Sequence, residues 1–270
     1  LDDVKKGQPS YGLFPWVVLG LRPEFNRTLT DGNSFVVKIL DFYKLSGNKK
    51  ILEDMFEPAL ASVKNLEEHI NEAGLLEEIP YSIWVDWAEV ETKGIPLVIN
   101  VTFAQAMKAV SEMALVLGKN DISEEYRHKS EKLANLFNNL FWDDNKGIYT
   151  DSIIGGIKSG HVSEQCNFLM MLYGFVERDR IPRIIKYLNE PGVEIGQIEA
   201  LQFYPVEALF KVGEGTMAIE LMKKRYGRIR KHGFDTISEI WSVDGIRNGG
   251  RWKCPYLRSA SQCGGTIAAY

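Results

Sequence analysis

The chain has 270 residues, of which 45% are hydrophobic and 25% are charged, and its formal net charge is −4. These values are typical of a globular protein with one large domain or two small ones, and the acidic balance argues against a nucleic-acid binder. No apolar run reaches about 18 residues, so we expect no membrane-spanning helix. The three cysteines are odd in number and lack metal-ligand spacing with the four histidines, so we expect no disulfide framework and no structural zinc. No other metal and no cofactor is predicted. The start of the chain has no signal-peptide pattern, which favours the cytoplasm, with a secreted form whose leader was removed as the alternative.

Apolar residues recur at helical spacing in eight segments. The predicted helices cover 31–46 with Asp31 or Asn33 as N-cap, 50–73, 97–117, 121–140 with Asp121 or Ser123 as N-cap, 162–175, 181–188, 197–211 and 215–230. The segments 97–117 and 162–175 are apolar nearly all round, whereas 121–140 has a single apolar stripe. This difference indicates that the first kind lines an interior and the second kind wraps it.

Short and long connections alternate along the chain. The long ones cover 1–30, 74–96, 141–160, 189–196 and 231–258. Since short turns make antiparallel hairpins, all long connections are expected on the same rim. The pattern predicts an all-α fold, a closed toroid of α-hairpins that forms one domain over residues 1–270. A solenoid is the alternative, but the spacing of the breaks is too uneven for a regular repeat.

Acidic and aromatic residues gather on the predicted long connections. They are Trp84, Asp86, Trp87, Trp142, Asp143, Asp144, Tyr149, His161, Glu239, Trp241 and Trp252. Carboxylates beside aromatic rings suit glycoside hydrolysis, in which one acid protonates the leaving oxygen, another activates water, and rings hold the sugar. Rings at a crowded rim that pack their own loops are the alternative for each tryptophan.

Two acids are the strongest candidates for catalysis. Glu239 precedes Ile240 and Trp241, and a carboxylate desolvated by an indole is suited to acid or base work. The alternative is a solvated loop residue with Trp241 packed beneath it. Asp86, in the sequence WVDW, is the second candidate, whereas Asp143 and Asp144 are expected to form a turn before Gly147.

Gln165 and Asn167 lie in the first turns of a predicted interior helix. Their amides could bind sugar hydroxyls, or they could satisfy neighbouring backbone groups, and the sequence does not decide between the two.

Four stretches resemble the catalytic domain of bacterial α-L-rhamnosidases. The run FYPVEALFKVGEGTMAIELMKKRYGRIRKHGFDTISEIW resembles the late segment of that domain, IWVDW and LFWDDNKGIYTDS are similar to two further signatures, and SASQCGGTIAAY resembles its closing S-H-x-x-G-W motif. The resemblance covers most of the chain from about Gln8 onward.

The resemblance implies an (α/α)6 six-hairpin toroid, incomplete in this chain, and an inverting glycosidase that acts on terminal α-L-rhamnosyl residues, with a carbohydrate as partner. Glu239 would then be the general base, Asp86 would bind sugar hydroxyls, and Trp84, Trp87 and Trp241 would shape the subsite. Another six-hairpin enzyme (a glucosidase, trehalase or unsaturated glucuronyl hydrolase) and a non-catalytic sugar-binding homologue are the alternatives.

The chain departs from the family pattern in two places. The acidic motif ending in W-x-G-D, which supplies the general acid in the family, has no equivalent in these residues. Gln262 and Thr266 stand where the closing motif has a histidine and a tryptophan. The resemblance therefore implies either a piece of a longer enzyme or a degenerate homologue.

Overall fold

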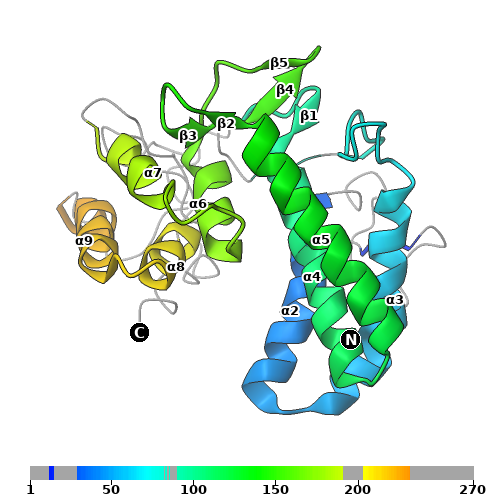
Figure 1. Ribbon diagram of the computed structural model, residues 1–270. Helices are drawn as coiled ribbons and strands as arrows, with labels where there is room; N and C mark the ends of the chain where they lie inside the picture. The colour runs from blue at the N-terminus through cyan, green and yellow to red at the C-terminus, as the bar shows by residue number, and fades with distance from the viewer. Residues whose placement is uncertain are drawn as a thin grey trace, which may run out of the picture. The chain divides into compact units, whose positions relative to one another are not determined.

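The computed structural model describes residues 12–14, 29–81, 83, 85, 90–190 and 203–231, in two compact units (Figure 1). The first unit contains residues 1–84, 92–141 and 152–158, and the second contains 85–91, 142–151 and 159–270. Over the described ranges, the secondary structure is mainly helical, with short strands of two or three residues. This agrees with the predicted all-α fold class.

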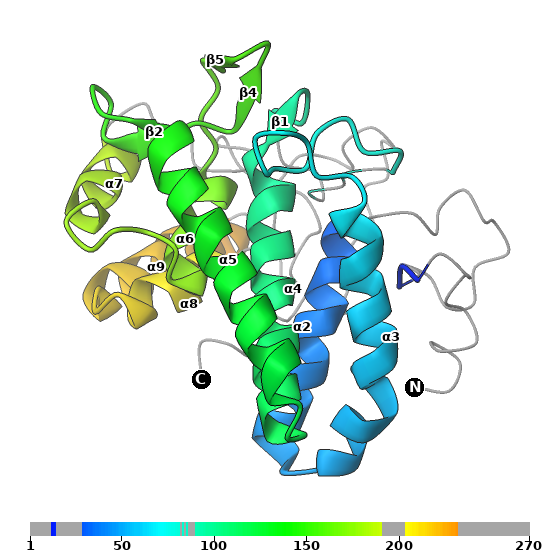
Figure 2. The ribbon, with the colours of Figure 1, turned by 45° about the vertical axis from the view of Figure 1, so that its right-hand side comes forward.

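The first unit is built from two helical hairpins. Helices α2 (Leu29–Ser46) and α3 (Lys49–Glu67) form one, and α4 (Leu97–Val116) and α5 (Asn120–Leu140) form the other. The hairpins pack through α2 and α4, and α3 also contacts α4. Within this unit the short turns lie at one end of the helices and the strands at the other (Figures 1 and 2). The two short turns and the described part of the 74–96 connection therefore lie at opposite ends of this unit, as predicted.

A small sheet caps the strand end of the first unit. Strand β4 (Ser152–Ile154) pairs antiparallel with β1 (Ile95–Pro96) on one side and with β5 (Ile157–Lys158) on the other. Gly94 approaches the backbone of Ile153 so closely that a Cβ atom would clash with it, and its φ is +68°. Only glycine fits this position without moving one of the two chains.

The second unit contains a β-hairpin and two further pairs of helices. Strands β2 (Trp142–Asp143) and β3 (Ile148–Tyr149) form the hairpin. The helices are α6 (Glu164–Tyr173), α7 (Ile181–Leu188), α8 (Phe203–Lys211) and α9 (Gly215–Lys231). Helix α6 packs on α8, α8 packs on α9, and β3 contacts both α6 and α7.

The two helices predicted to line an interior are the most buried ones. Every residue of α6 is buried, and α4 is buried on most of its sides. Helix α5 buries a stripe that includes Tyr126, Leu133 and Phe137, while an ion-pair network around Arg127 covers its outer face. A helix that is apolar on nearly all sides is thus interior, and a helix with one apolar stripe is on the outside.

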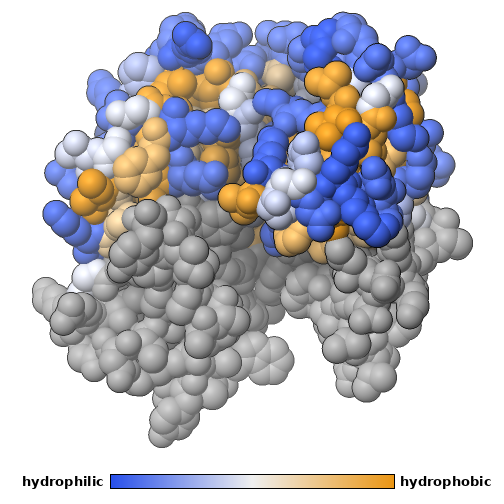
Figure 3. Space-filling view, turned by 90° about the horizontal axis from the view of Figure 1, so that it is seen from below, coloured by the Kyte–Doolittle hydropathy of each residue, from blue (hydrophilic) through white to orange (hydrophobic). Residues whose placement is uncertain are grey.

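The described surface carries both polar and hydrophobic side chains. Among the described residues in the view from below, hydrophobic side chains lie interspersed with hydrophilic ones (Figure 3). Leu45 is 89% exposed and Leu115 is 62% exposed, beside the ion pair between Lys44 and Glu112. None of the helices in the part of the chain that the structure describes is sufficiently long and apolar to span a bilayer.

Three local predictions about helix ends were wrong. The first helix begins at Leu29, and Asn33 donates to Thr102 Oγ1 (3.2 Å) inside the unit instead of capping it. Helix α5 begins at Asn120 without a side-chain cap, so the predicted caps Asp121 and Ser123 lie inside the helix, where the Ser123 carbonyl accepts from Ser111 Oγ (2.7 Å).

The third correction concerns the end of α3, which was predicted at Ala73. The helix ends at Glu67, and the next residues form a turn in which Asn71 Oδ1 accepts from Leu75 N (3.0 Å). The 197–211 helix is described only from Phe203 onward, and the remainder of that prediction lies outside the described residues.

Candidate active site

The β2–β3 hairpin is shaped by the two acids that the sequence assigned to a turn. Asp143 Oδ1 accepts from the backbone N–H groups of Asn145 (3.0 Å) and Lys146 (3.1 Å), which closes the turn before Gly147. Asp144 pairs with Arg183 at 2.6 Å, and this guanidinium lowers the pKa of the exposed Asp144 carboxyl. Both acids therefore organise the loop, as predicted.

Trp142 is enclosed by protein and is not an open platform for a sugar. Its side chain is only 6% exposed, and the guanidinium carbons of Arg180 and Arg183 lie 4.6 and 5.2 Å from its ring centroid. Its other close neighbour is the Tyr149 ring, with centroids 4.9 Å apart. Cation–π contacts of this kind stabilise the packing of the hairpin on α7. Of the two interpretations open for Trp142, the structure supports loop packing.

A buried carboxylate joins three segments of the second unit. Asp151 is fully buried, and its Oδ1 accepts from both the N–H and the hydroxyl of Ser163, each at 2.7 Å. Its Oδ2 accepts from His161 Nδ1 at 2.6 Å and from Glu91 N–H at 3.2 Å. Ser163 Oγ in turn accepts from Cys166 N–H (3.3 Å) and caps α6. We call Asp151, His161 and Ser163 the Asp151 cluster.

The Asp151 cluster holds the start of α6 in place through Ser163. It also holds the backbone of Glu91, four residues after the WVDW sequence. A carboxylate with several donors loses little by burial, because each lone pair that left water has found a partner. No local pattern in the sequence marks Asp151, since its partners lie up to 60 residues away. This residue was missed by sequence reasoning for that reason.

Of the residues predicted to bind substrate, Gln165 and Asn167 are described, and both lie on α6. The Asn167 side chain is fully buried, accepts from Tyr149 N–H (3.1 Å), and donates to the carbonyls of Tyr149 (3.0 Å) and Ser163 (2.9 Å). This geometry favours the interpretation in which Asn167 satisfies backbone groups.

Gln165 lines a cavity of about 10 Å³ together with Tyr204 and Pro205. That space holds about one water molecule rather than a sugar ring. Contact of Gln165 or Asn167 with a sugar stays a prediction.

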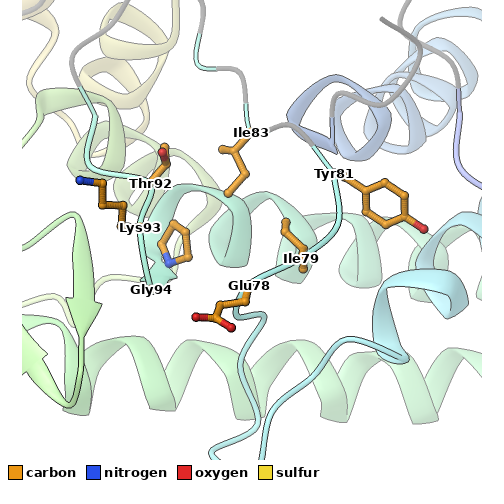
Figure 4. A pocket seen from close by; sticks show the side chains of 8 residues that line it. Glu78, Ile79, Tyr81, Ile83, Thr92, Lys93 and Gly94 are labelled. Atoms are coloured by element: carbon orange, nitrogen blue, oxygen red, sulfur yellow. The ribbon is translucent and has the colours of Figure 1, made fainter. Parts of the chain in front are cut away.

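A larger cavity, of about 360 Å³, opens in the first unit between the two ends of the 78–96 connection. One wall carries Glu78, Ile79, Tyr81 and Ile83, and the other carries Thr92, Lys93, Gly94 and Pro96 (Figure 4). We call this cavity the 78–96 pocket. Its polar groups include a carboxylate, an ammonium and a hydroxyl, so it offers both donors and acceptors.

Buried hydrogen bonds hold both walls of the 78–96 pocket in place. The Asn100 side chain accepts from Leu76 N–H (2.8 Å) and donates to the carbonyls of Leu76 (3.1 Å) and Pro96 (2.8 Å), so one residue ties the two walls to α4. The Tyr81 hydroxyl donates to Asn65 Oδ1 (3.2 Å), and Ser152 donates to the Ile95 carbonyl (3.0 Å). The pocket is therefore formed before any ligand arrives.

The remaining predicted site residues lie outside the described residues. They are Trp84, Asp86, Trp87, Glu239, Trp241 and Trp252. That these residues lie together in one active site stays a prediction. Over the described ranges, no three histidine, cysteine, aspartate or glutamate side chains gather as metal ligands would.

Comparison with solved structures shows the same fold in glycosidases. A GH78 family rhamnosidase of Bacillus sp. GL1 is 21% identical with a TM-score of 0.77, and the alignment covers 90% of this chain and 25% of that one. A rhamnosidase from Klebsiella oxytoca with rhamnose bound is 16% identical with a TM-score of 0.79, over 95% of this chain and 50% of that one. The chain thus spans a quarter to a half of the length of these two rhamnosidases.

A third similar structure is a mannosylglycerate hydrolase of Thermus thermophilus in complex with glucose. It is 14% identical with a TM-score of 0.71, over 98% of this chain and 84% of that one. No curated protein sequence matches the chain.

The family described as the bacterial alpha-L-rhamnosidase 6 hairpin glycosidase domain matches residues 1–259, nearly the whole sequence. The helical hairpins of both units and the similar solved structures agree with that match. The chain therefore belongs to the family of bacterial α-L-rhamnosidase six-hairpin glycosidase domains.

Proposed function

We propose that the chain is the catalytic domain of a glycoside hydrolase that releases terminal α-L-rhamnosyl residues with inversion at the anomeric carbon. The observation that carries the proposal is the family match over residues 1–259, on a chain whose described helices form the expected hairpins. The rhamnose bound in the similar Klebsiella oxytoca rhamnosidase supports the choice of sugar.

In the proposed reaction Glu239 is the general base. It takes a proton from a water molecule as the water oxygen attacks the anomeric carbon, and the bond from that carbon to the leaving oxygen breaks. A general acid, not assigned among these residues, protonates the leaving oxygen. In an inverting site the acid and base stand roughly 6.5–9.5 Å apart, which leaves room for the water.

The other predicted residues have binding roles in this proposal. Asp86 accepts hydrogen bonds from sugar hydroxyls, and Trp84, Trp87, Trp241 and Trp252 shape the subsite by offering apolar ring faces. The Asp151 cluster supports this proposal, because Asp151 accepts a hydrogen bond from the backbone N–H of Glu91, five residues after Asp86.

The proposal is tested with Glu239→Gln in the full-length protein. Loss of a general base is expected to lower kcat on an aryl α-L-rhamnoside by about 10²- to 10⁴-fold. Glu220→Gln, at an exposed position of α9, is the matched control and should keep wild-type turnover. Wild-type turnover by Glu239→Gln would remove Glu239 from the mechanism, and the anomer released first, observed by NMR, decides between inversion and retention.

A second candidate is another six-hairpin glycosidase. The mannosylglycerate hydrolase supports it, because its TM-score of 0.71 is close to the 0.77 of the Bacillus rhamnosidase. A panel of aryl glycosides separates the two, since each predicts a different sugar with the highest kcat/KM. Calorimetry with rhamnose tests the non-catalytic alternative, which predicts binding without turnover of any substrate in the panel.

A further inference from the structure

The His161 side chain separates a buried carboxylate from solvent. Its imidazole is 44% exposed, whereas the Asp151 carboxylate to which it is bonded is 0% exposed. The His161 backbone is held independently of the ring, because its carbonyl accepts a hydrogen bond from the Asp151 N–H (3.1 Å). A substitution of the side chain therefore removes the cover of the carboxylate and keeps this backbone contact.

The direction of the hydrogen bond between the two side chains follows from their chemistry. The Asp151 carboxylate has no donor group and already accepts from Ser163 and Glu91. His161 Nδ1, at 2.6 Å from Asp151 Oδ2, therefore carries a proton and is the donor. Among the described residues the other ring nitrogen, Nε2, has no hydrogen-bond partner, so the contact with Asp151 orients the ring.

Asp151 Oδ2 is shared between this imidazole and the backbone of Glu91. The Glu91 N–H lies 3.2 Å from the oxygen, at the long end of the usual range for such a bond, and the imidazole is the closer donor. A hydrogen bond that is shielded from water is stronger than the same bond in contact with water. Loss of the imidazole would let water donate to Oδ2, and water would then compete with the longer bond from Glu91.

Glu91 is connected along the chain to the predicted sugar-binding acid. Asp151, His161 and Glu91 all belong to the second unit, which also contains residues 85–91. Asp86, which binds sugar hydroxyls in the proposed function, precedes Glu91 by five residues. The hydrogen bond from Glu91 to Asp151 thus anchors one end of the segment that carries Asp86.

We propose that His161 is a positioning residue, which holds residues 85–91 in place through Asp151 and the backbone N–H of Glu91. The inference rests on the proposed function, in which Asp86 binds the substrate. His161 needs no contact with the substrate in this role, because two hydrogen bonds in series connect its ring to the backbone of Glu91.

Two substitutions of His161 in the full-length protein separate the ring from its hydrogen bond. His161→Ala removes the donor and the cover of the carboxylate. His161→Asn keeps an N–H donor close to the position of Nδ1, so it should retain the contact with Asp151. His128→Ala is the matched control, because that ring is 62% exposed and lies on α5 of the first unit.

The first measurement is hydrogen–deuterium exchange of the Glu91 amide, which needs no substrate. We expect exchange on the order of tenfold faster in His161→Ala than in wild type, and close to the wild-type rate in His161→Asn and His128→Ala. Equal exchange rates in wild type and His161→Ala overturn the inference, since Glu91 would then be held without His161.

The second measurement is the steady-state kinetics of an aryl α-L-rhamnoside. KM should rise on the order of tenfold in His161→Ala with little change in kcat, because sugar binding is weakened while the proposed base Glu239 is unaffected. The conservative variant His161→Asn should keep KM near the wild-type value. A merely structural role predicts a lower melting temperature in His161→Ala and an unchanged KM, and that result overturns the inference even where the amide exchanges faster.

Failure of this inference is distinct from failure of the proposed function. An active wild type, together with a wild-type KM in His161→Ala, overturns the positioning role alone. A wild type that is inactive on the rhamnoside overturns the proposed function, and the exchange of the Glu91 amide then decides by itself whether His161 holds residues 85–91.

Discussion

Removal of the Asp151 carboxylate is expected to destabilise the second unit strongly. The carboxylate accepts four hydrogen bonds, at 2.7, 2.7, 2.6 and 3.2 Å, and the side chain is fully buried. In Asp151→Ala, the Ser163 N–H loses its acceptor inside the protein, and the Ser163 hydroxyl and the His161 ring lose theirs too. An unsatisfied buried donor costs about 1–3 kcal/mol.

Since the four bonds share one acceptor group, their effects do not simply add. We expect the free energy of unfolding to fall by about 3–5 kcal/mol in Asp151→Ala, the range seen when one partner of a buried polar pair is removed. For a chain of this size such a loss lowers the melting temperature by about 10 °C. Asp151→Asn should lower the free energy of unfolding by less than Asp151→Ala, because asparagine keeps one oxygen acceptor. Some loss is still expected, because its NH₂ group faces hydrogen-bond donors.

The assay is thermal unfolding followed by circular dichroism, with urea unfolding as the second measurement. Asp179→Ala, at an exposed aspartate between α6 and α7, is the matched control and should change stability by less than about 0.5 kcal/mol. A loss below about 1 kcal/mol in Asp151→Ala would refute the reasoning, since it would mean that the four donors readily find other partners.

Two further predictions concern groups packed against the Asp151 cluster. Burial raises the pKa of Tyr149 to about 12, so above pH 10 the unfolded chain releases a proton that the folded chain keeps. The free energy of unfolding should therefore be unaffected below pH 10 and fall by about 2–3 kcal/mol as the pH approaches 12. Tyr149→Phe should lack this decline in urea unfolding at stepped pH. Asn167→Leu removes the acceptor of the buried Tyr149 N–H and should lower the free energy of unfolding by about 2–4 kcal/mol, as measured by urea unfolding.

Matched controls sharpen both measurements. Asn135→Leu, on the exposed face of α5, should change stability by less than about 0.5 kcal/mol. An equal effect of the Asn135 and Asn167 variants would contradict the assigned backbone contacts. A Tyr149→Phe variant with the wild-type alkaline decline would show that another group is responsible.

The positions of the described helices followed largely from the sequence. Helix α7 begins and ends where the amphipathic pattern predicted, at Ile181 and Leu188. The all-round apolar pattern of α6 identified a helix buried on every side. These predictions depend on the period of the apolar residues, which is a local property that any chain segment carries with it.

The local errors share one cause. Asn33, Ser123 and Asn71 all have side chains or backbone groups that can cap a helix or close a turn, and the sequence does not state which partner each one takes. Thr102, Ser111 and Leu75 supplied those partners. A hydrogen bond to another residue, whether four positions away as for Leu75 or far along the chain as for Thr102, competes with a helix cap.

By itself, the sequence determined the family, the helical hairpins and the chemical types expected at the site, because motifs and periodicity are written along the chain. Only the tertiary structure decided which side chains are engaged in contacts within the protein and which remain available to a ligand. It enclosed Trp142 between two arginines, used Asn167 to hold β3, made Asp151 the acceptor for three residues, and left the carboxylate of Glu78 at an open pocket. The physical reason is that burial and hydrogen-bond partners depend on residues up to 69 positions apart, and no local pattern records them.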